Sequence, residues 1–159
     1  GDSEELAKQM IVEMRSADRQ LTVGALMAAF HYMVAHPEQE YTQKLLDEIL
    51  NILSYGKMPG MISAAWVLHN LFYAGCPILH GENLKKVDEC LILLADMLHK
   101  NTENGLAFKE VLHMRKACVA IAFRMRQMVQ TDSYEGVQRW KAVACDPKEI
   151  NEVKNEWVW

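Results

Sequence analysis

Cationic side chains fall on one side of a predicted helix, residues 106–130. At about 100° per residue, Lys109, His113, Lys116 and Arg124 share a strip, which Gln127 extends. Clustered positive charge of this kind attracts phosphates or an acidic protein, so the strip is a candidate binding site. The alternative is an ordinary solvated face, on which long side chains lie along apolar neighbours.

Acidic residues gather on two other predicted helices. Asp47 and Glu48 belong to residues 38–55, and Asp88 and Glu89 belong to residues 84–100. If these helices stack in register, the four carboxylates form an acidic ladder suited to a cationic partner protein. Simple exposure of the outer face of each helix would explain the same charges.

His69 stands in an otherwise apolar predicted helix, where it either has a hydrogen-bond partner in the core or marks the pocket of a small helical enzyme. With Cys76, His80 and Cys90 it supplies metal-ligand types, but only Cys76 and His80 are closely spaced. We therefore predict no metal and no cofactor. The chain has no glycine-rich phosphate loop and no nucleophile elbow, so no catalytic residue is nominated.

The chain ends on Trp157-Val158-Trp159. Trp157 and Trp159 are large apolar side chains that usually pack against something. We expect them to cover the open end of the domain itself, as capping segments do in helical arrays. Packing on a partner or on a second copy is the alternative.

Apolar residues recur with helical spacing throughout, and no strand-like alternation appears. Asp18 is a predicted N-cap, Pro37 ends one helix, and Gly56 stops the next. The predicted helices are residues 4–15, 19–35, 38–55, 61–74, 84–100, 106–130 and 134–144, with a last one after Asp146-Pro147. The sequence predicts an all-α protein.

Two pieces of the sequence recur. Residues 46–53, LDEILNIL, return forty-one residues later as VDECLILL, and residues 24–29 resemble residues 63–68 at an offset of thirty-nine. A third, weaker copy of the second piece begins at Lys116. A repeat of about forty residues made of paired helices is typical of stacked helical arrays. We predict hairpins of residues 19–35 with 38–55 and of 61–74 with 84–100, the tail pairing with residues 106–130.

Within these copies, residues 65–71, AWVLHNL, resemble the second half of HEAT and armadillo repeats. Residues 114–120, MRKACVA, resemble the apolar-Arg-x-Ala start of the same pattern. The resemblance covers about residues 19–130. It implies a HEAT-like α-α superhelix of two to three hairpins, six to eight helices in all, that serves as a protein-binding scaffold and has no catalytic residues to transfer.

At 159 residues, with half of them apolar, the chain is predicted to form a single domain, residues 1–159. A net charge of −4 disfavours a dedicated nucleic-acid binder. Four scattered cysteines favour a reduced, cytoplasmic protein. The charge-free stretch 58–81 is interrupted by glycine and proline, so we predict no membrane helix.

These observations favour a non-enzymatic protein-binding module, regulatory or toxin-neutralising, that presents one face of a helical array. One alternative is a HEAT-like nucleic-acid-binding protein or DNA glycosylase that uses the basic strip. Another is a small enzyme with a pocket around His69. The sequence identifies neither the partner nor the oligomeric state.

Overall fold

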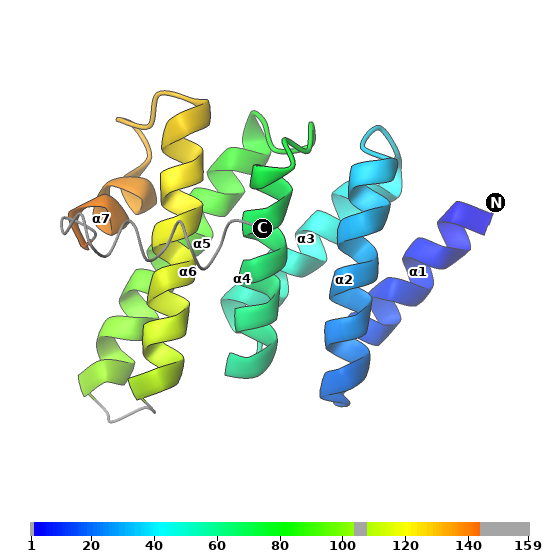
Figure 1. Cartoon of the computed structure of the whole chain (residues 1–159), viewed down its shortest axis with the longest axis horizontal. Helices are drawn as coiled ribbons and strands as arrows, with labels where there is room; N and C mark the ends of the chain where they lie inside the picture. The colour runs from blue at the N-terminus through cyan, green and yellow to red at the C-terminus, as the bar shows by residue number, and fades with distance from the viewer. Residues whose placement is uncertain (1, 104–107, 144–159) are drawn as a thin grey trace. The chain divides into compact units, whose positions relative to one another are not determined.

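The computed structural model describes residues 2–103 and 108–143, without the side chains at 58–59, 99–103, 108–111 and 143. All regular structure in this part of the chain is helical, which confirms the all-α prediction (Figure 1). The helices are α1 Asp2–Met14, α2 Arg19–Ala35, α3 Glu40–Tyr55, α4 Met58–Tyr73, α5 Glu82–Glu103, α6 Phe108–Met128 and α7 Glu135–Val143. The predicted helix after Asp146-Pro147 lies outside the described residues.

Local signals explain where several helices begin and end. The Asp18 carboxylate accepts a hydrogen bond of 2.9 Å from the Gln20 backbone N–H, which caps α2 as predicted. Gly56 follows the last residue of α3, also as predicted. Helix α4 begins three residues earlier than predicted, because Pro59 is accommodated in its first turn, where a backbone N–H has no intrahelical partner.

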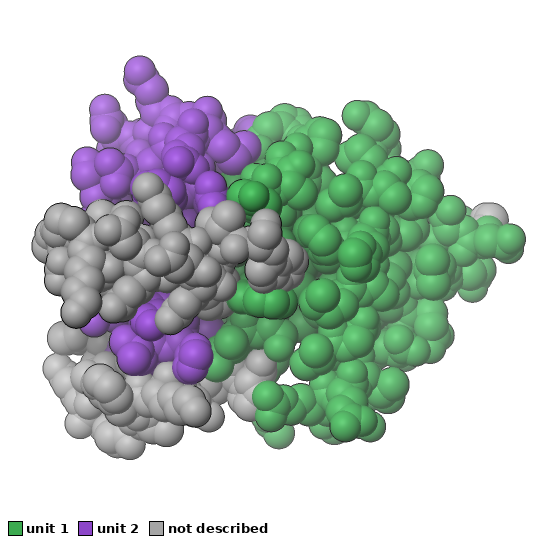
Figure 2. All heavy atoms as spheres, viewed as in Figure 1, with its two compact units in different colours: residues 1–80 green, residues 81–159 purple. Residues whose placement is uncertain are grey.

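The chain divides into two compact units (Figure 2). Unit 1 comprises residues 1–80 and contains α1 to α4, and unit 2 comprises residues 81–159 and contains α5 to α7. The prediction that residues 1–159 form a single domain stays a prediction.

Unit 1 consists of two layers of helices. Helices α2 and α4 pack side by side in one layer, and α1 and α3 lie behind them in the other (Figure 1). The main sequential pairings are α1 with α2 and α3 with α4, while α2 and α3 make a smaller contact. The hairpins are therefore displaced by one helix from the predicted pairing of residues 19–35 with 38–55.

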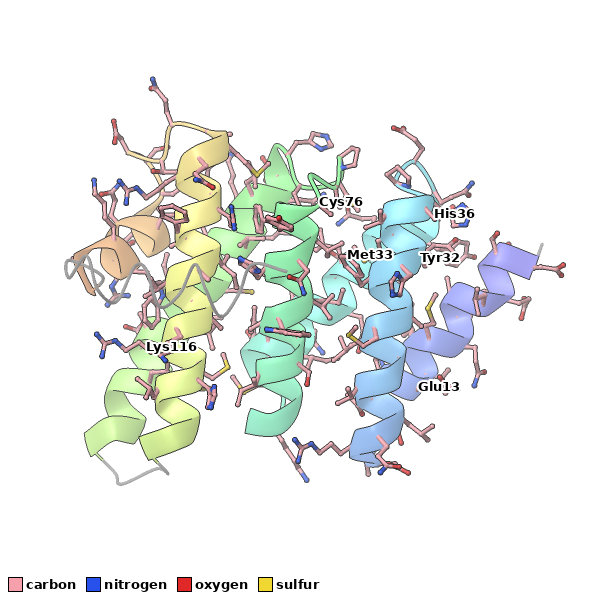
Figure 3. The ribbon with its side chains drawn as sticks, viewed as in Figure 1. Glu13, Tyr32, Met33, His36, Cys76 and Lys116 are labelled. Atoms are coloured by element: carbon pink, nitrogen blue, oxygen red, sulfur yellow. The ribbon has the colours of Figure 1, made fainter. Side chains whose placement is uncertain are left out.

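The core of unit 1 lies between these layers. Its largest fully buried side chains are Leu26, Met33, Leu45, Leu46, Ile49, Leu53, Leu68 and Leu71. Cys76, just after α4, is also buried, and its thiol donates a hydrogen bond of 3.6 Å to the Met33 carbonyl in α2 (Figure 3). This contact joins the end of α4 to its neighbour in the same layer.

In unit 2, α5 packs against α6, and the short helix α7 packs against both. Trp140 of α7 is 4% exposed and donates a hydrogen bond of 2.9 Å from its indole to the Leu91 carbonyl. Gly136 permits the close approach of α7, because a Cβ there would lie 2.5 Å from the Asp88 carbonyl oxygen. Helices α4 and α5, which correspond to the second predicted hairpin, belong to different units.

Candidate protein-binding face

Next to its buried side, α2 carries a second apolar side that is partly open to solvent. One side of the helix is buried in unit 1 through Thr22, Ala25, Leu26, Ala29, Tyr32 and Met33. The adjoining side presents Val23, Met27, Phe30 and Val34, which we call the α2 stripe. Val34 is 43% exposed, and the other three are partly buried. Exposure of apolar surface to water is unfavourable, so the exposed part of the stripe gains free energy when it contacts another apolar surface.

The spacing of the α2 stripe suits contact with another helix. Its residues follow one another at intervals of four, three and four, the spacing at which helices pack at a shallow angle. Beside the stripe, Gly24 and Ala28 are exposed, and a Cβ built at Gly24 would meet nothing within 4 Å. These small residues allow a second helix to approach closely.

Charges lie only at the two ends of this face. No Asp, Glu, Lys or Arg occurs in residues 20–37. Arg19 is exposed at the beginning of α2, and Glu38 is exposed just beyond its end. The sequence contained the signal for this face, the charge-free run, but our prediction of binding residues rested on charged clusters and did not include it.

The predicted basic strip is placed only in part. His113 is exposed on α6, and Lys116 and Arg124 are partly buried on the same helix (Figure 3 labels Lys116). Arg124 donates a hydrogen bond of 3.1 Å to the Gln127 side chain, and Lys116 and Arg124 each have further interactions within the protein. The side chain of Lys109 lies outside the described part of the chain. Binding by the strip stays a prediction.

The four acidic residues are not equivalent. Asp47 and Glu89 are exposed, whereas Glu48 and Asp88 are buried, each 7% exposed. Glu48 and Asp88 each form contacts inside their own unit, and partner binding by the four acids stays a prediction. Trp157 and Trp159, the other predicted binding residues, lie outside the described residues.

Glu48 forms an ion pair with the Arg15 guanidinium. Nε and Nη2 of Arg15 each donate a hydrogen bond of 2.9 Å to a different carboxylate oxygen of Glu48. This two-point contact, which favours the charged guanidinium, raises the pKa of Arg15. It fixes the end of α1 against α3.

Asp88 caps a helix that is distant in sequence. Its carboxylate accepts a hydrogen bond of 2.9 Å from the backbone N–H of Val137, in the first turn of α7. The first N–H groups of a helix have no intrahelical acceptor, so this carboxylate supplies one and complements the helix dipole. Asp88 thereby holds α7 on α5.

His69 is 1% exposed in α4, and its Nδ1 lies 3.2 Å from the side-chain oxygen of Asn70. It therefore behaves as a core histidine with a polar neighbour, and it does not line the pocket found in unit 1. His80 Nδ1 lies 2.6 Å from the Pro77 carbonyl oxygen. Among the described residues, no group of three or more His, Cys, Asp or Glu side chains could hold a metal ion.

A second polar contact, near the beginning of α1, ties α1 to α3 in unit 1. The Tyr41 hydroxyl donates a hydrogen bond of 2.6 Å to Glu4, and the Lys8 ammonium lies 3.0 Å from the same carboxylate oxygen. The hydrogen bond from Tyr41 is the largest cause that lowers the pKa of Glu4 to about 2, and Lys8 lowers it further. Both partners favour the ionised carboxylate.

In residues 2–103 and 108–143, no helix has both the length and the apolar character needed to cross a bilayer.

The described chain thus belongs to the class of all-α proteins built from packed helical hairpins. Comparison with protein-family models, with curated proteins and with solved structures found no match.

Proposed function

We propose that this chain is a protein-binding module built on HEAT-like helical hairpins, and that the α2 stripe binds an amphipathic helix of a partner protein. The observation that carries the proposal is the partly exposed apolar stripe, Val23, Met27, Phe30 and Val34, on a helix without internal charge. Apolar faces of this kind on an otherwise well-packed helix mark interaction sites.

The same geometry defines the partner. The partner helix needs apolar residues at the same intervals of four, three and four as the α2 stripe. Where it crosses Gly24 and Ala28, it needs small or short apolar side chains. Arg19 and Glu38 lie at opposite ends of the face, so a helix that places an acidic residue against Arg19 and a basic residue against Glu38 is complementary. The two-layer packing of α1 to α4 supports the HEAT-like arrangement, because paired helices in two layers are how such repeats stack.

The test compares two matched charge insertions. Met27→Glu places a carboxylate in the α2 stripe, and Val12→Glu places one at a residue of α1 that is 64% exposed. A partner recovered with the wild type is purified, and its Kd is measured by calorimetry against both variants. Removing one buried methionine contact is worth about 1.5–3 kcal/mol, so we expect M27E to weaken binding about tenfold or more. V12E should change the Kd less than about twofold, since an exposed site off the stripe makes no contact.

Two results would overturn the proposal. One is a partner that binds the wild type, M27E and V12E equally well, because its contact then lies elsewhere. The other is a wild-type dimer, seen by light scattering, that M27E dissociates, because the stripe would then be covered by a second copy. Circular dichroism of both variants confirms that each is folded.

A further inference from the structure

A pocket of about 480 Å³ lies at one end of unit 1, on described residues from α1, α2, α3 and α4. Helices α2 and α4 both begin at this end (Figure 1), and the pocket reaches Arg15, Arg19 and Lys57. Its volume is within the range of pockets that bind small molecules, about 300–1,000 Å³. None of the residues of the α2 stripe lines it.

Positive charge is concentrated at this pocket, although unit 1 as a whole carries a net negative charge. Residues 1–80 contain five Lys or Arg and nine Asp or Glu, which gives unit 1 a formal charge of −4. Three of the five cations, Arg15, Arg19 and Lys57, line this pocket. The remaining two are paired on the surface, Lys8 with Glu4 and Lys44 with Glu40. The acidic unit thus has one cationic pocket.

Two of the three cations are available to a ligand. Arg15 is held by the buried Glu48, which neutralises one positive charge and fixes the guanidinium in place. Neither Arg19 nor Lys57 forms an ion pair with any residue that the structure describes. The charged lining therefore has an excess of two positive charges, and the matching ligand group is an anion.

The rest of the lining is largely apolar. Ile52 of α3 is buried, while Tyr55, one turn later, is 76% exposed and presents its ring at the rim. Gly60 adds no side chain to the cavity, and a Cβ there would approach only Ile52, at 3.7 Å. A ligand with an apolar body could therefore lie against Ile52 and Tyr55 while its anionic group faces Arg19 and Lys57.

We propose that this pocket binds a small carboxylate with an apolar aryl or aliphatic body. The carboxylate pairs with Arg19 and Lys57, and the apolar body is removed from water against Ile52 and Tyr55. The pocket is separate from the α2 stripe, so this inference does not depend on the proposed protein partner.

The probes are phenylbutyrate and phenylbutanol, which share an apolar body and differ in the anionic group. Each is titrated into the ¹⁵N-labelled full chain and followed by amide chemical shifts. We expect phenylbutyrate to shift the amides of Tyr55, Gly56 and Gly60 saturably, with a Kd at least about tenfold lower than that of phenylbutanol.

Two double variants with the same change in net charge provide the control. R19Q/K57Q removes the available cations of the pocket, and K8Q/K44Q removes the paired cations elsewhere in unit 1. We expect R19Q/K57Q to raise the Kd for phenylbutyrate at least about tenfold and K8Q/K44Q to change it less than about twofold. All four side chains are at the surface, so both variants are expected to fold, and their amide spectra verify it.

Three results would overturn the inference. The first is no saturable shift at the pocket with phenylbutyrate at millimolar concentration. The second is equal affinity for both probes, which would mean that the cations make no contact. The third is an equal loss of affinity in both double variants, which would reflect net charge alone.

Discussion

Residues 46–53 of α3 and residues 87–94 of α5 carry the same pattern in the two units, and four of their five shared apolar positions are used alike. The fifth differs, because Ile52 is buried whereas Leu93 is 42% exposed. Four equivalent pairs are buried in both copies: Leu46 and Val87, Ile49 and Cys90, Leu50 and Leu91, and Leu53 and Leu94. These positions recur at the spacing of one helix face, so each copy turns that face into the core of its own unit.

The acidic residues beside these positions differ between the units. In unit 1 the second acid, Glu48, is buried against Arg15, whereas in unit 2 the first acid, Asp88, is buried against the beginning of α7. The two positions are separated by about 100° around the helix. The neighbouring element therefore determines which acid is buried, while the repeated apolar residues determine only the core. Similar sequence in a repeat does not guarantee a similar surface.

The largest expected effect comes from substitutions at an apolar position that is buried in both copies of the repeat. Leu53→Ala and Leu94→Ala each remove a fully buried leucine at an equivalent position. We expect each to lower the free energy of unfolding by about 2–5 kcal/mol, because a cavity is left in a packed core. Urea denaturation followed by circular dichroism measures both. A loss below 1 kcal/mol in only one variant would show that the two cores are not equivalent.

Glycine substitutions test how closely α7 approaches in unit 2. Gly136→Ala puts a Cβ 2.5 Å from the Asp88 carbonyl oxygen and 2.9 Å from the Leu91 Cβ, so we expect a loss of about 1–3 kcal/mol. Gly24→Ala in unit 1 meets nothing within 4 Å and should instead stabilise the helix by about 0.5–1 kcal/mol. Thermal unfolding of each variant shows whether the substitution lowers or raises its stability. A neutral G136A would contradict the close approach.

Acid substitutions test the difference between the copies. Asp88→Ala leaves the first turn of α7 without its cap, and we expect a loss of about 0.5–2 kcal/mol, whereas Glu89→Ala should stay within about 0.5 kcal/mol. In unit 1 the order reverses, with Glu48→Ala more destabilising than Asp47→Ala. Urea denaturation of the four variants measures this pattern. The same order in both units would mean that the acids are used alike.

The smallest expected effect is the pH dependence of unit 1. The pKa of Glu4 is lowered to about 2 from 4.5, so its ionised form favours the folded state. That contribution is fully present above pH 4.5 and is lost as the pH falls towards 2. Tyr41→Phe removes the largest cause of the shift, so the variant should lose less stability over this pH range than the wild type. Parallel stability curves for the two proteins would exclude the contribution of Tyr41.

Much of the fold was predictable because its signals are local. Asp18, Gly56 and the helical spacing of leucines gave most helix positions. The pairing of the helices into hairpins was not predictable, because a repeat in the sequence shows its period but not which helix begins each repeat. The contacts of Glu48 and Asp88 were also hidden, because Arg15 lies 33 residues from Glu48, and Val137 lies 49 residues from Asp88. A glycine inside a helix did not reveal them either, because Gly136 has a close neighbour whereas Gly24 has none.

For the candidate sites too, local sequence signals were predictive, whereas contacts between distant residues were not. Residues 20–37 contain no charge, so the α2 stripe was visible in the sequence, but its exposure depends on which side of α2 the other helices cover. The pocket was not visible. Its cations come from the end of α1, the beginning of α2 and the beginning of α4, and only the folded chain brings them together.

Each unit contains a buried cysteine whose reaction with a thiol reagent reports local unfolding. Cys76 in unit 1 and Cys118 in unit 2 are shielded from solvent, and burial raises the pKa of both thiols. A thiol-labelling reagent reacts with the thiolate, so each sulfur stays inert until the surrounding helices separate. Modification rates at the two residues, resolved by peptide mass spectrometry, therefore report how often each half of the chain opens.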